Sequence, residues 1–127
     1  MLTLRLRMQF AADSRDEATA VLRSLVGPVR AEQGCRGTEL LRDGGDGFDL
    51  TWIEEWVGGE DFERHLRGPS FRRILAVIEM AAERPLVEID DVASRRGFDL
   101  VEEILGVSAS SSALMNRFEE EGCKECG

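Results

Sequence analysis

The single histidine of the chain is the side chain best suited to moving protons. A free imidazole has a pKa of about 6.5, so His65 can take up and release protons near neutral pH. Helical spacing from Phe62 puts His65 beside an apolar edge, near the inner face of the segment 60–66. A lone histidine at a helix edge is also often a structural or interface residue, and the sequence leaves both interpretations open.

Aromatic and acidic side chains alternate along residues 48–57, which read FDLTWIEEWV. Successive side chains of a strand point to opposite faces, so Trp52, Glu54 and Trp56 share one face. Together with Phe71 they can supply an aromatic wall and a carboxyl group that holds a hydroxyl. The alternative is that both tryptophans are ordinary packing residues of the core or of a dimer interface.

Three cysteines are present, Cys35, Cys123 and Cys126. An odd number does not indicate a disulfide framework in a reducing compartment. The CxxC formed by the last two is typical of a redox pair or of half a zinc site, but equally of a tail without function. Residues 1–92 hold one histidine and one cysteine, so we expect no four-ligand structural metal site there.

The charge of the chain argues against two classes of partner. The formal net charge is −9, and such a field repels both nucleic acid and anionic membrane surfaces. No stretch approaches the roughly 20 apolar residues of a membrane span. The first ten residues, MLTLRLRMQF, alternate with arginines and lack the apolar core of a signal peptide, so we expect a cytoplasmic protein.

Apolar periodicity predicts alternating strands and helices over residues 1–92. Ser14 and Glu17 match a capping box, which predicts a helix with Ser14 as its N-cap. Gly27 and Pro28 predict a kink or break in this helix, and Gly34 predicts its end. The other predicted elements are strands over 2–10, 35–42, 48–57 and 86–92, a turn over 43–47, and helices over 60–66 and 71–83.

This order, β-α-β-β-α-β, predicts an α+β domain of ferredoxin-like topology over residues 1–92. The expected sheet has four antiparallel strands with helices on one face only. Because the strand over 48–57 carries apolar residues on both faces, we expect a second copy of the chain to cover the open face, giving a homodimer. Residues 93–127 are expected to form a C-terminal extension, partly helical or disordered, with an amphipathic turn or two near Phe98.

The segment from Val29 to Ile78 resembles the antibiotic-biosynthesis monooxygenase domain. The resemblance rests on VRAEQGCRGTELLRD, a turn, a strand ending in IEEW, and EDFERHLRGPSFRRIL. It covers roughly residues 1–92, and the tail has no counterpart. It implies a dimeric α+β barrel in which two sheets pack by their open faces, often with a cavity between the helices and the sheet of each protomer.

The resemblance also implies a function. Members include oxygenases that use no metal or flavin and act on activated phenols and quinols; others degrade haem, isomerise small molecules or have no known activity. We therefore expect a cofactor-independent monooxygenase acting on an aromatic or quinol-type molecule. His65 is the candidate base, with Glu54 as the alternative, and Trp52, Trp56 and Phe71 are candidate substrate-binding residues. The rival hypotheses are a non-catalytic dimeric module that binds a small ligand, and a purely structural protein whose tail docks onto a partner.

A haem site of the kind found in this family is not expected. It needs an iron-binding histidine on the helix after Phe71, and that helix reads RRILAVIEMAAER. An asparagine expected on the first strand is also missing, since Asn116 in the tail is the only asparagine of the chain. We therefore predict no cofactor.

Overall fold

The computed structural model describes residues 1–42, 47–93 and 97–106. The chain divides into two units, Met1–Ala93 and Ser94–Gly127. The elements in chain order are β1 (Leu2–Met8), α1 (Ala12–Arg30), β2 (Cys35–Arg42), β3 (Leu50–Trp56), α2 (Gly59–Leu66), α3 (Pro69–Glu79), β4 (Leu86–Asp91) and α4 (Phe98–Leu105).

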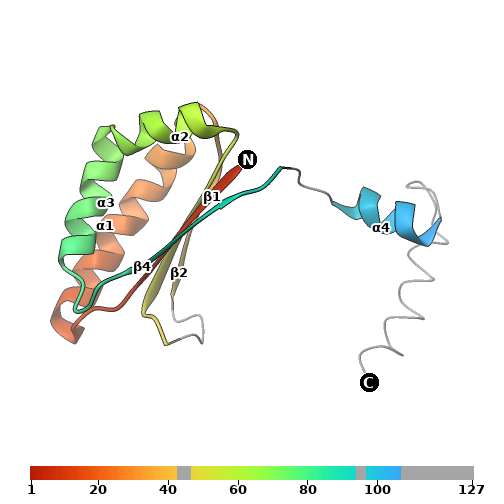
Figure 1. The fold of residues 1–127 in the computed structure, drawn as a ribbon. Coiled ribbons are helices and arrows are strands. Elements are labelled where there is room, and N and C mark those ends of the chain that lie inside the picture. Colours follow the sequence, from red (N-terminus) through yellow and green to blue (C-terminus); the bar gives the residue numbers. More distant parts are fainter. Residues whose placement is uncertain (43–46, 94–96, 107–127) are drawn as a thin grey trace, which may run out of the picture. The chain divides into compact units, whose positions relative to one another are not determined.

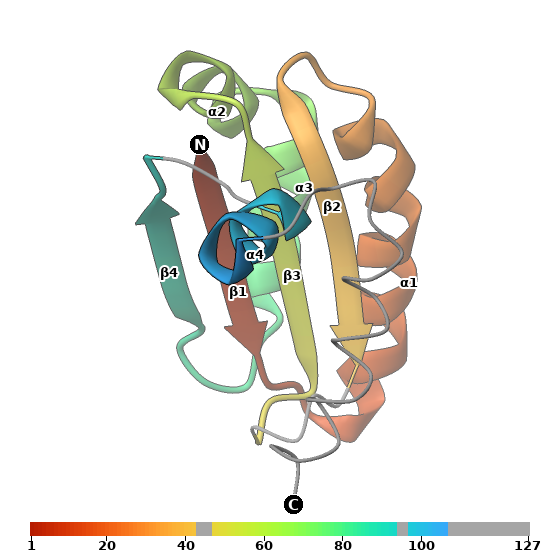
Figure 2. The same cartoon turned by 90° about the vertical axis from the view of Figure 1, so that its right-hand side faces the viewer.

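Four strands form one antiparallel sheet in the order β2-β3-β1-β4. Helices α1 and α3 lie side by side against one face of this sheet (Figures 1 and 2). This arrangement confirms the predicted ferredoxin-like α+β fold.

The side chains that alternate along β1 and β3 divide the sheet into two faces. Leu4 of β1 stands opposite Glu54 of β3, and Leu6 stands opposite Trp52. Directly opposed residues share a face, so all four point toward the helices. The buried apolar core lies on that side and comprises Leu4, Leu6, Met8, Phe10, Ala18, Leu22, Leu25, Val29, Leu50, Trp52, Trp56, Phe62, Ile74 and Val77. Glu54 is therefore a carboxyl group within the core.

The predicted start of the first helix is wrong by three residues, since its N-cap was expected at Ser14. Helix α1 begins at Ala12 with Ala11 as its N-cap, and no side chain caps it. The tertiary structure sets this start: Asp49, just before β3, accepts the backbone N–H of Phe10 at 2.7 Å and pairs with Arg15 at 3.4 Å. These contacts hold the chain where it leaves β1, so the helix begins before Ser14 is reached.

A kink or a break was predicted at Gly27 and Pro28, and the break does not occur, because α1 continues through Pro28 to Arg30. A proline inside a helix removes one hydrogen bond and crowds the preceding turn. Here Leu25 and Val29, on either side of the proline, are both fully buried in the core. Their packing holds the last turn in place despite the proline.

Two further predictions concern the C-terminal parts of the described chain. Helix α3 ends at Glu79, earlier than the predicted residue 83, and the chain then turns so that the N–H of Ala82 donates to the carbonyl of Gln9 at 2.8 Å. The predicted amphipathic segment near Phe98 is helical as α4, which ends at the left-handed Gly106. Most of the predicted turn over 43–47, and Cys123 and Cys126, lie outside the described residues.

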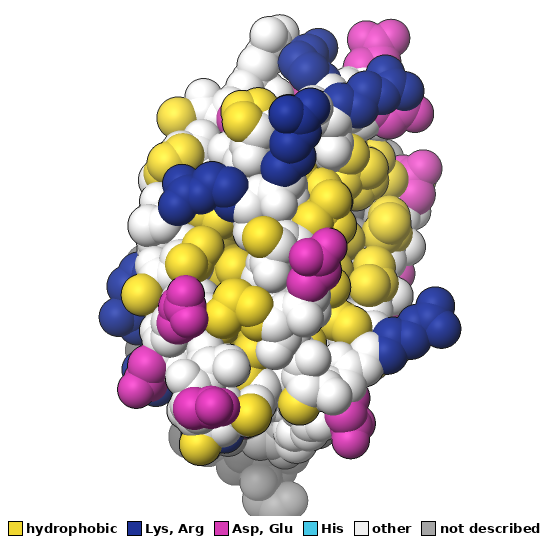
Figure 3. All heavy atoms as spheres, turned by 90° about the vertical axis from the view of Figure 1, so that its left-hand side faces the viewer, with side chains coloured by type: hydrophobic (Ala, Val, Ile, Leu, Met, Phe, Trp, Pro, Cys, Tyr) yellow, Lys and Arg dark blue, Asp and Glu magenta, His cyan; other side chains and the backbone are white. Residues whose placement is uncertain are grey.

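The outer surface of the helical layer carries side chains of both charge signs around apolar areas (Figure 3). In the described part of the chain, none of the helices has the length and apolar character needed to cross a membrane.

The apolar side chains of α3 differ in how deeply they are buried. Ile74 and Val77 are fully buried, whereas Phe71 and Ile78 are half-buried and Leu75 is 44% exposed. The stability of this layer should therefore depend most on Ile74 and Val77.

We predict that Ile74→Ala lowers the free energy of unfolding by about 2–5 kcal/mol, because it removes packed methyl groups and leaves a cavity. Urea denaturation followed by circular dichroism measures the change. Leu75→Ala is the matched control and should cost clearly less. Equal losses in the two variants would contradict the observed orientation of α3.

Candidate functional site

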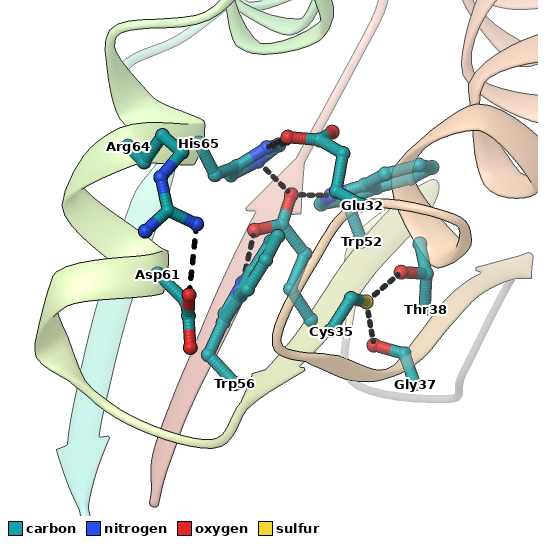
Figure 4. Close-up of polar contacts among 10 residues, drawn as sticks. Glu32, Cys35, Gly37, Thr38, Trp52, Trp56, Asp61, Arg64 and His65 are labelled. Carbon is teal, nitrogen blue, oxygen red and sulfur yellow. Dashed lines mark hydrogen bonds and ion pairs between the residues drawn. The ribbon is translucent and has the colours of Figure 1, made fainter.

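A buried carboxylate, that of Glu54, accepts hydrogen bonds from three side chains (Figure 4). Its Oε1 accepts from Trp56 Nε1 at 2.9 Å, and its Oε2 accepts from Trp52 Nε1 at 2.7 Å and from His65 Nε2 at 2.8 Å. The two tryptophans flank Glu54 at positions i−2 and i+2 of β3, so the strand period alone aims both indoles at it. A carboxylate that is 0% exposed needs such donors, since burying an unpaired charge is very costly.

His65 lies between two carboxylates. Its Nε2 faces Glu54, and its Nδ1 lies 3.0 and 3.1 Å from the two carboxylate oxygens of Glu32. An ionised carboxylate oxygen only accepts, so with both glutamates ionised both ring nitrogens donate, and the ring is an imidazolium. Burial lowers the pKa of His65, but the hydrogen bond and charge of Glu54, reinforced by those of Glu32, outweigh burial and raise this pKa above 6.5.

Aromatic rings enclose the imidazolium. The Trp56 indole stacks on the His65 ring with centroids 4.6 Å apart and an interplanar angle of 30°, and Phe71 meets that ring edge-on at 5.4 Å. A cation against an indole face gains a further electrostatic attraction. We call the five residues Glu32, Trp52, Glu54, Trp56 and His65 the His65 array.

The turn that carries Glu32 is fixed by Gly34. This glycine has a φ of +83°, and a Cβ at this position would overlap the carboxyl group of Asp61 on α2. Its carbonyl accepts the N–H of Val57 at 2.8 Å, which ties the turn to the end of β3. The turn after α1, the end of β3 and the start of α2 therefore hold one another, and this sets the distance from Glu32 to His65.

The structure brings all five predicted site residues together. His65, Glu54, Trp52 and Trp56 are in direct contact through hydrogen bonds or stacking, and Phe71 packs against the histidine. Sequence reasoning missed Glu32. It lies in a turn, where no periodicity operates, and 33 positions from His65, so only its place just before the turn glycine marks it.

Three hollows are lined by described residues. None of the three is the cavity that was expected between α3 and the sheet. One is lined by residues such as Gln9 and Phe48, another lies between α1 and β2, and the third lies along α2 near Arg67. None of the three includes a member of the His65 array, and Trp52, Glu54, Trp56 and His65 are each at most 1% exposed. The array thus fills its own place in the core.

Two other features of the described residues bear on cofactors. They contain no group of three or more histidine, cysteine or acidic side chains arranged to hold a metal ion. Cys35 is half-buried, and its Sγ lies 3.2 Å from Thr38 Oγ1.

We predict that stability falls as pH rises above neutrality. A group whose pKa is higher in the folded than in the unfolded state contributes stability that is complete below the unfolded pKa. That contribution is lost as pH rises through the folded pKa, so for His65 the loss begins above about 6.5. Urea midpoints measured across the neutral and mildly alkaline range test this. His65→Gln should flatten the profile, and a parent midpoint that increases with pH over this range would contradict the assignment.

We predict that Glu54→Gln lowers the free energy of unfolding by about 3–5 kcal/mol, because it leaves the imidazolium with one buried counter-charge fewer. The amide that replaces the carboxylate would also turn its own N–H groups toward one of the N–H donors of the array, and two donors cannot form a hydrogen bond with each other. Denaturation curves give the value, with Glu39→Gln on the exposed side of β2 as the control, expected within about 0.5 kcal/mol of the parent. A loss in Glu54→Gln no larger than in this control would mean that the array is not charged.

The comparisons with known proteins agree with this fold. The family described as antibiotic biosynthesis monooxygenase, abbreviated ABM, matches residues 1–77, which include every member of the His65 array. No curated protein matches the chain.

Three solved structures are similar in fold to this chain. The Mycobacterium tuberculosis protein Rv0793 is 23% identical, with 76% of this chain and 98% of that one covered at a TM-score of 0.67. The protein PA3566 of Pseudomonas aeruginosa is 30% identical, with 75% and 94% covered and a TM-score of 0.60. A structure described as an antibiotic biosynthesis monooxygenase is 22% identical, with 74% and 100% covered and a TM-score of 0.64. The family match spans more than half of the chain and the folds agree, so this chain belongs to the antibiotic biosynthesis monooxygenase family.

Proposed function

We propose that this protein is a cofactor-independent monooxygenase that oxidises an electron-rich aromatic, quinol-type small molecule. The observation that carries the proposal is the His65 array, in which a stacked imidazolium is held between a buried carboxylate and a half-exposed one. Membership of a family that is described as monooxygenase supports it.

The proposed reaction needs few chemical groups from the protein. A phenolic or enolic hydroxyl must lose its proton, because the resulting anion gives electrons to oxygen far more readily than the neutral molecule does. Oxygen then bonds to the ring carbon para or ortho to that hydroxyl, and loss of water from the peroxide leaves a carbonyl group. When the oxidised carbon is a CH₂ group that becomes C=O, the substrate supplies all four electrons that O₂ accepts. One oxygen atom then becomes the carbonyl oxygen, and the other leaves as water.

The His65 array suits the proton transfer and the stabilisation of the anion. We propose that the imidazolium of His65 donates a hydrogen bond to the substrate oxygen and stabilises the anion, while the hydroxyl proton leaves by way of the half-exposed Glu32 carboxylate. Three donors already occupy the oxygens of Glu54, so we propose that Glu54 orients and charges His65 instead of taking the substrate proton itself. Trp56 and Phe71 border the ring of His65 and would form the aromatic wall, with Trp52 holding Glu54 from behind.

A second candidate function is a module that binds a small ligand without chemistry. The observation in its favour is that the array residues in the core are almost completely buried and that both nitrogens of His65 are engaged. An array of this kind also serves as a structural link between α2 and β3. Turnover distinguishes the two functions.

We also propose that the protein acts as a homodimer through the face of the sheet turned away from α1 and α3. This face carries the half-buried Ile53 and two ion pairs that bridge β1 and β4, Arg5–Asp90 at 3.8 Å and Arg7–Glu88 at 3.3 Å. Paired charges are easier to cover than free ones, because each keeps its counter-charge. A cytoplasmic location remains part of the proposal.

For the reaction, we predict that the protein consumes oxygen with at least one member of a panel of quinols and polyphenols. His65→Gln should then lower the rate by about 10²–10³-fold, as removal of a donor that stabilises an oxyanion does. An oxygen electrode measures the rate, and Glu63→Gln, exposed on the same helix, is the control that should leave it unchanged. If one panel member binds tightly and none is oxidised, the binding-module hypothesis replaces the oxygenase.

For the assembly, we predict a mass of twice 14.1 kDa by light scattering at micromolar concentration. Ile53→Lys places a charge in the centre of the proposed interface and should yield a monomer. Glu17→Lys, exposed on α1 in the helical layer on the opposite side of the sheet, should not. A parent protein with the mass of a single chain would exclude the dimer.

A further inference from the structure

The two carboxylates that hold His65 differ sharply in their surroundings. The side chains of His65 and Glu54 are 0% exposed, whereas the side chain of Glu32 is 31% exposed. The His65 array therefore meets solvent at Glu32. Among the members of the array, Glu32 is the one that a molecule in solvent can reach.

The two carboxylates also differ in how firmly they are held. Glu54 accepts hydrogen bonds from two indoles and from the imidazolium. Among the described residues, the side-chain hydrogen bonds of Glu32 go only to His65 Nδ1, at 3.0 and 3.1 Å. Moving the Glu32 carboxylate into water breaks this one contact with His65, while moving Glu54 would strand three buried donors.

The backbone of the turn does not have to move with the Glu32 side chain. The N–H of Glu32 donates to the carbonyl of Val29 at 3.0 Å, and its carbonyl accepts the N–H of Cys35 at 3.1 Å. Rotation about the side-chain bonds of Glu32 leaves both of these bonds intact. The carboxylate can therefore swing outward without any movement of the backbone.

The place that Glu32 would vacate has a definite chemistry. It presents one charged N–H donor, the Nδ1–H of His65, with Trp56 and Phe71 packed around the ring that carries it. An oxygen anion satisfies this donor as Glu32 does, and an attached aromatic ring suits the neighbouring side chains. Phenolates, enolates of aromatic ketones and aromatic carboxylates meet both conditions.

We propose that Glu32 is a displaceable occupant of a binding site for an anionic oxygen, and that a ligand with an acidic hydroxyl or a carboxylate replaces it on His65 Nδ1. This inference rests on the proposed function in one respect, because it names the group by which the substrate binds. When the ligand is a phenol, its O–H bond breaks, the proton passes by way of the displaced Glu32 carboxylate to water, and the phenolate remains opposite the imidazolium. The negative charge of the phenolate then takes the place of the negative charge of Glu32 beside His65.

The test uses the imidazole signals in proton NMR, which belong to one residue because the chain has a single histidine. Glu32→Ala removes the occupant and should create a site for acetate, the simplest carboxylate. We expect millimolar acetate to shift the His65 signals of this variant saturably and to leave those of the parent unchanged. Glu63→Ala is the matched control and should respond like the parent. Chloride at equal concentration separates a specific site from an effect of ionic strength.

A second titration with 4-nitrophenol, whose absorption differs between phenol and phenolate, tests the ligand class. Glu32→Ala should bind its phenolate form about tenfold or more tightly than the parent, because the competing side chain is gone. If Glu32→Ala fails to fold, Glu32→Ser is titrated in the same way. The proposal is overturned if neither acetate nor 4-nitrophenol moves the His65 signals of a folded Glu32 variant.

The same data separate this inference from the oxygenase proposal. Binding of acetate and 4-nitrophenolate without oxygen uptake by any phenol supports the site and refutes the oxygenase. Oxygen uptake by the parent, with KM and His65 signals that do not respond to loss of Glu32, supports the oxygenase and refutes the site.

Discussion

The burial of one carboxylate, that of Glu54, is the constraint on which the centre of this protein depends. A charge in the core is tolerated only if donors converge on it from fixed positions. Two of those donors come from the same strand, since Trp52 and Trp56 flank Glu54 with the period of the sheet. The third, His65, fixes how α2 lies against β3. The position of α2 therefore depends on the carboxylate of Glu54 on β3.

Stability alone does not explain such an arrangement. Buried ion pairs often contribute less than well-packed apolar residues of similar volume, because the loss of hydration offsets their attraction. What an array of this kind provides is a charged ring in a fixed orientation, with a counter-charge on each side. That property has a use in binding or proton transfer, which is why the array carries the functional proposal.

Much of the site could be predicted from the sequence because it follows local periodicity. The strand period placed Glu54 between the tryptophans on one face, and helical spacing placed His65 on the inner side of α2. Glu32 could not be found in this way, since a turn residue has no period and its partner is distant in the chain. The start of α1 also escaped prediction, because Asp49 sets it through a contact that only the folded chain makes.

Both tryptophans of the chain donate to the same carboxylate, and one of them stacks on the imidazolium. The ultraviolet emission of the protein therefore originates almost entirely inside the His65 array. A protonated imidazole against an indole quenches that emission by accepting an electron from the excited ring. Intrinsic fluorescence thus reports the state of this one cluster, and the brightness of the folded protein serves as a built-in gauge of whether its central charge is in place.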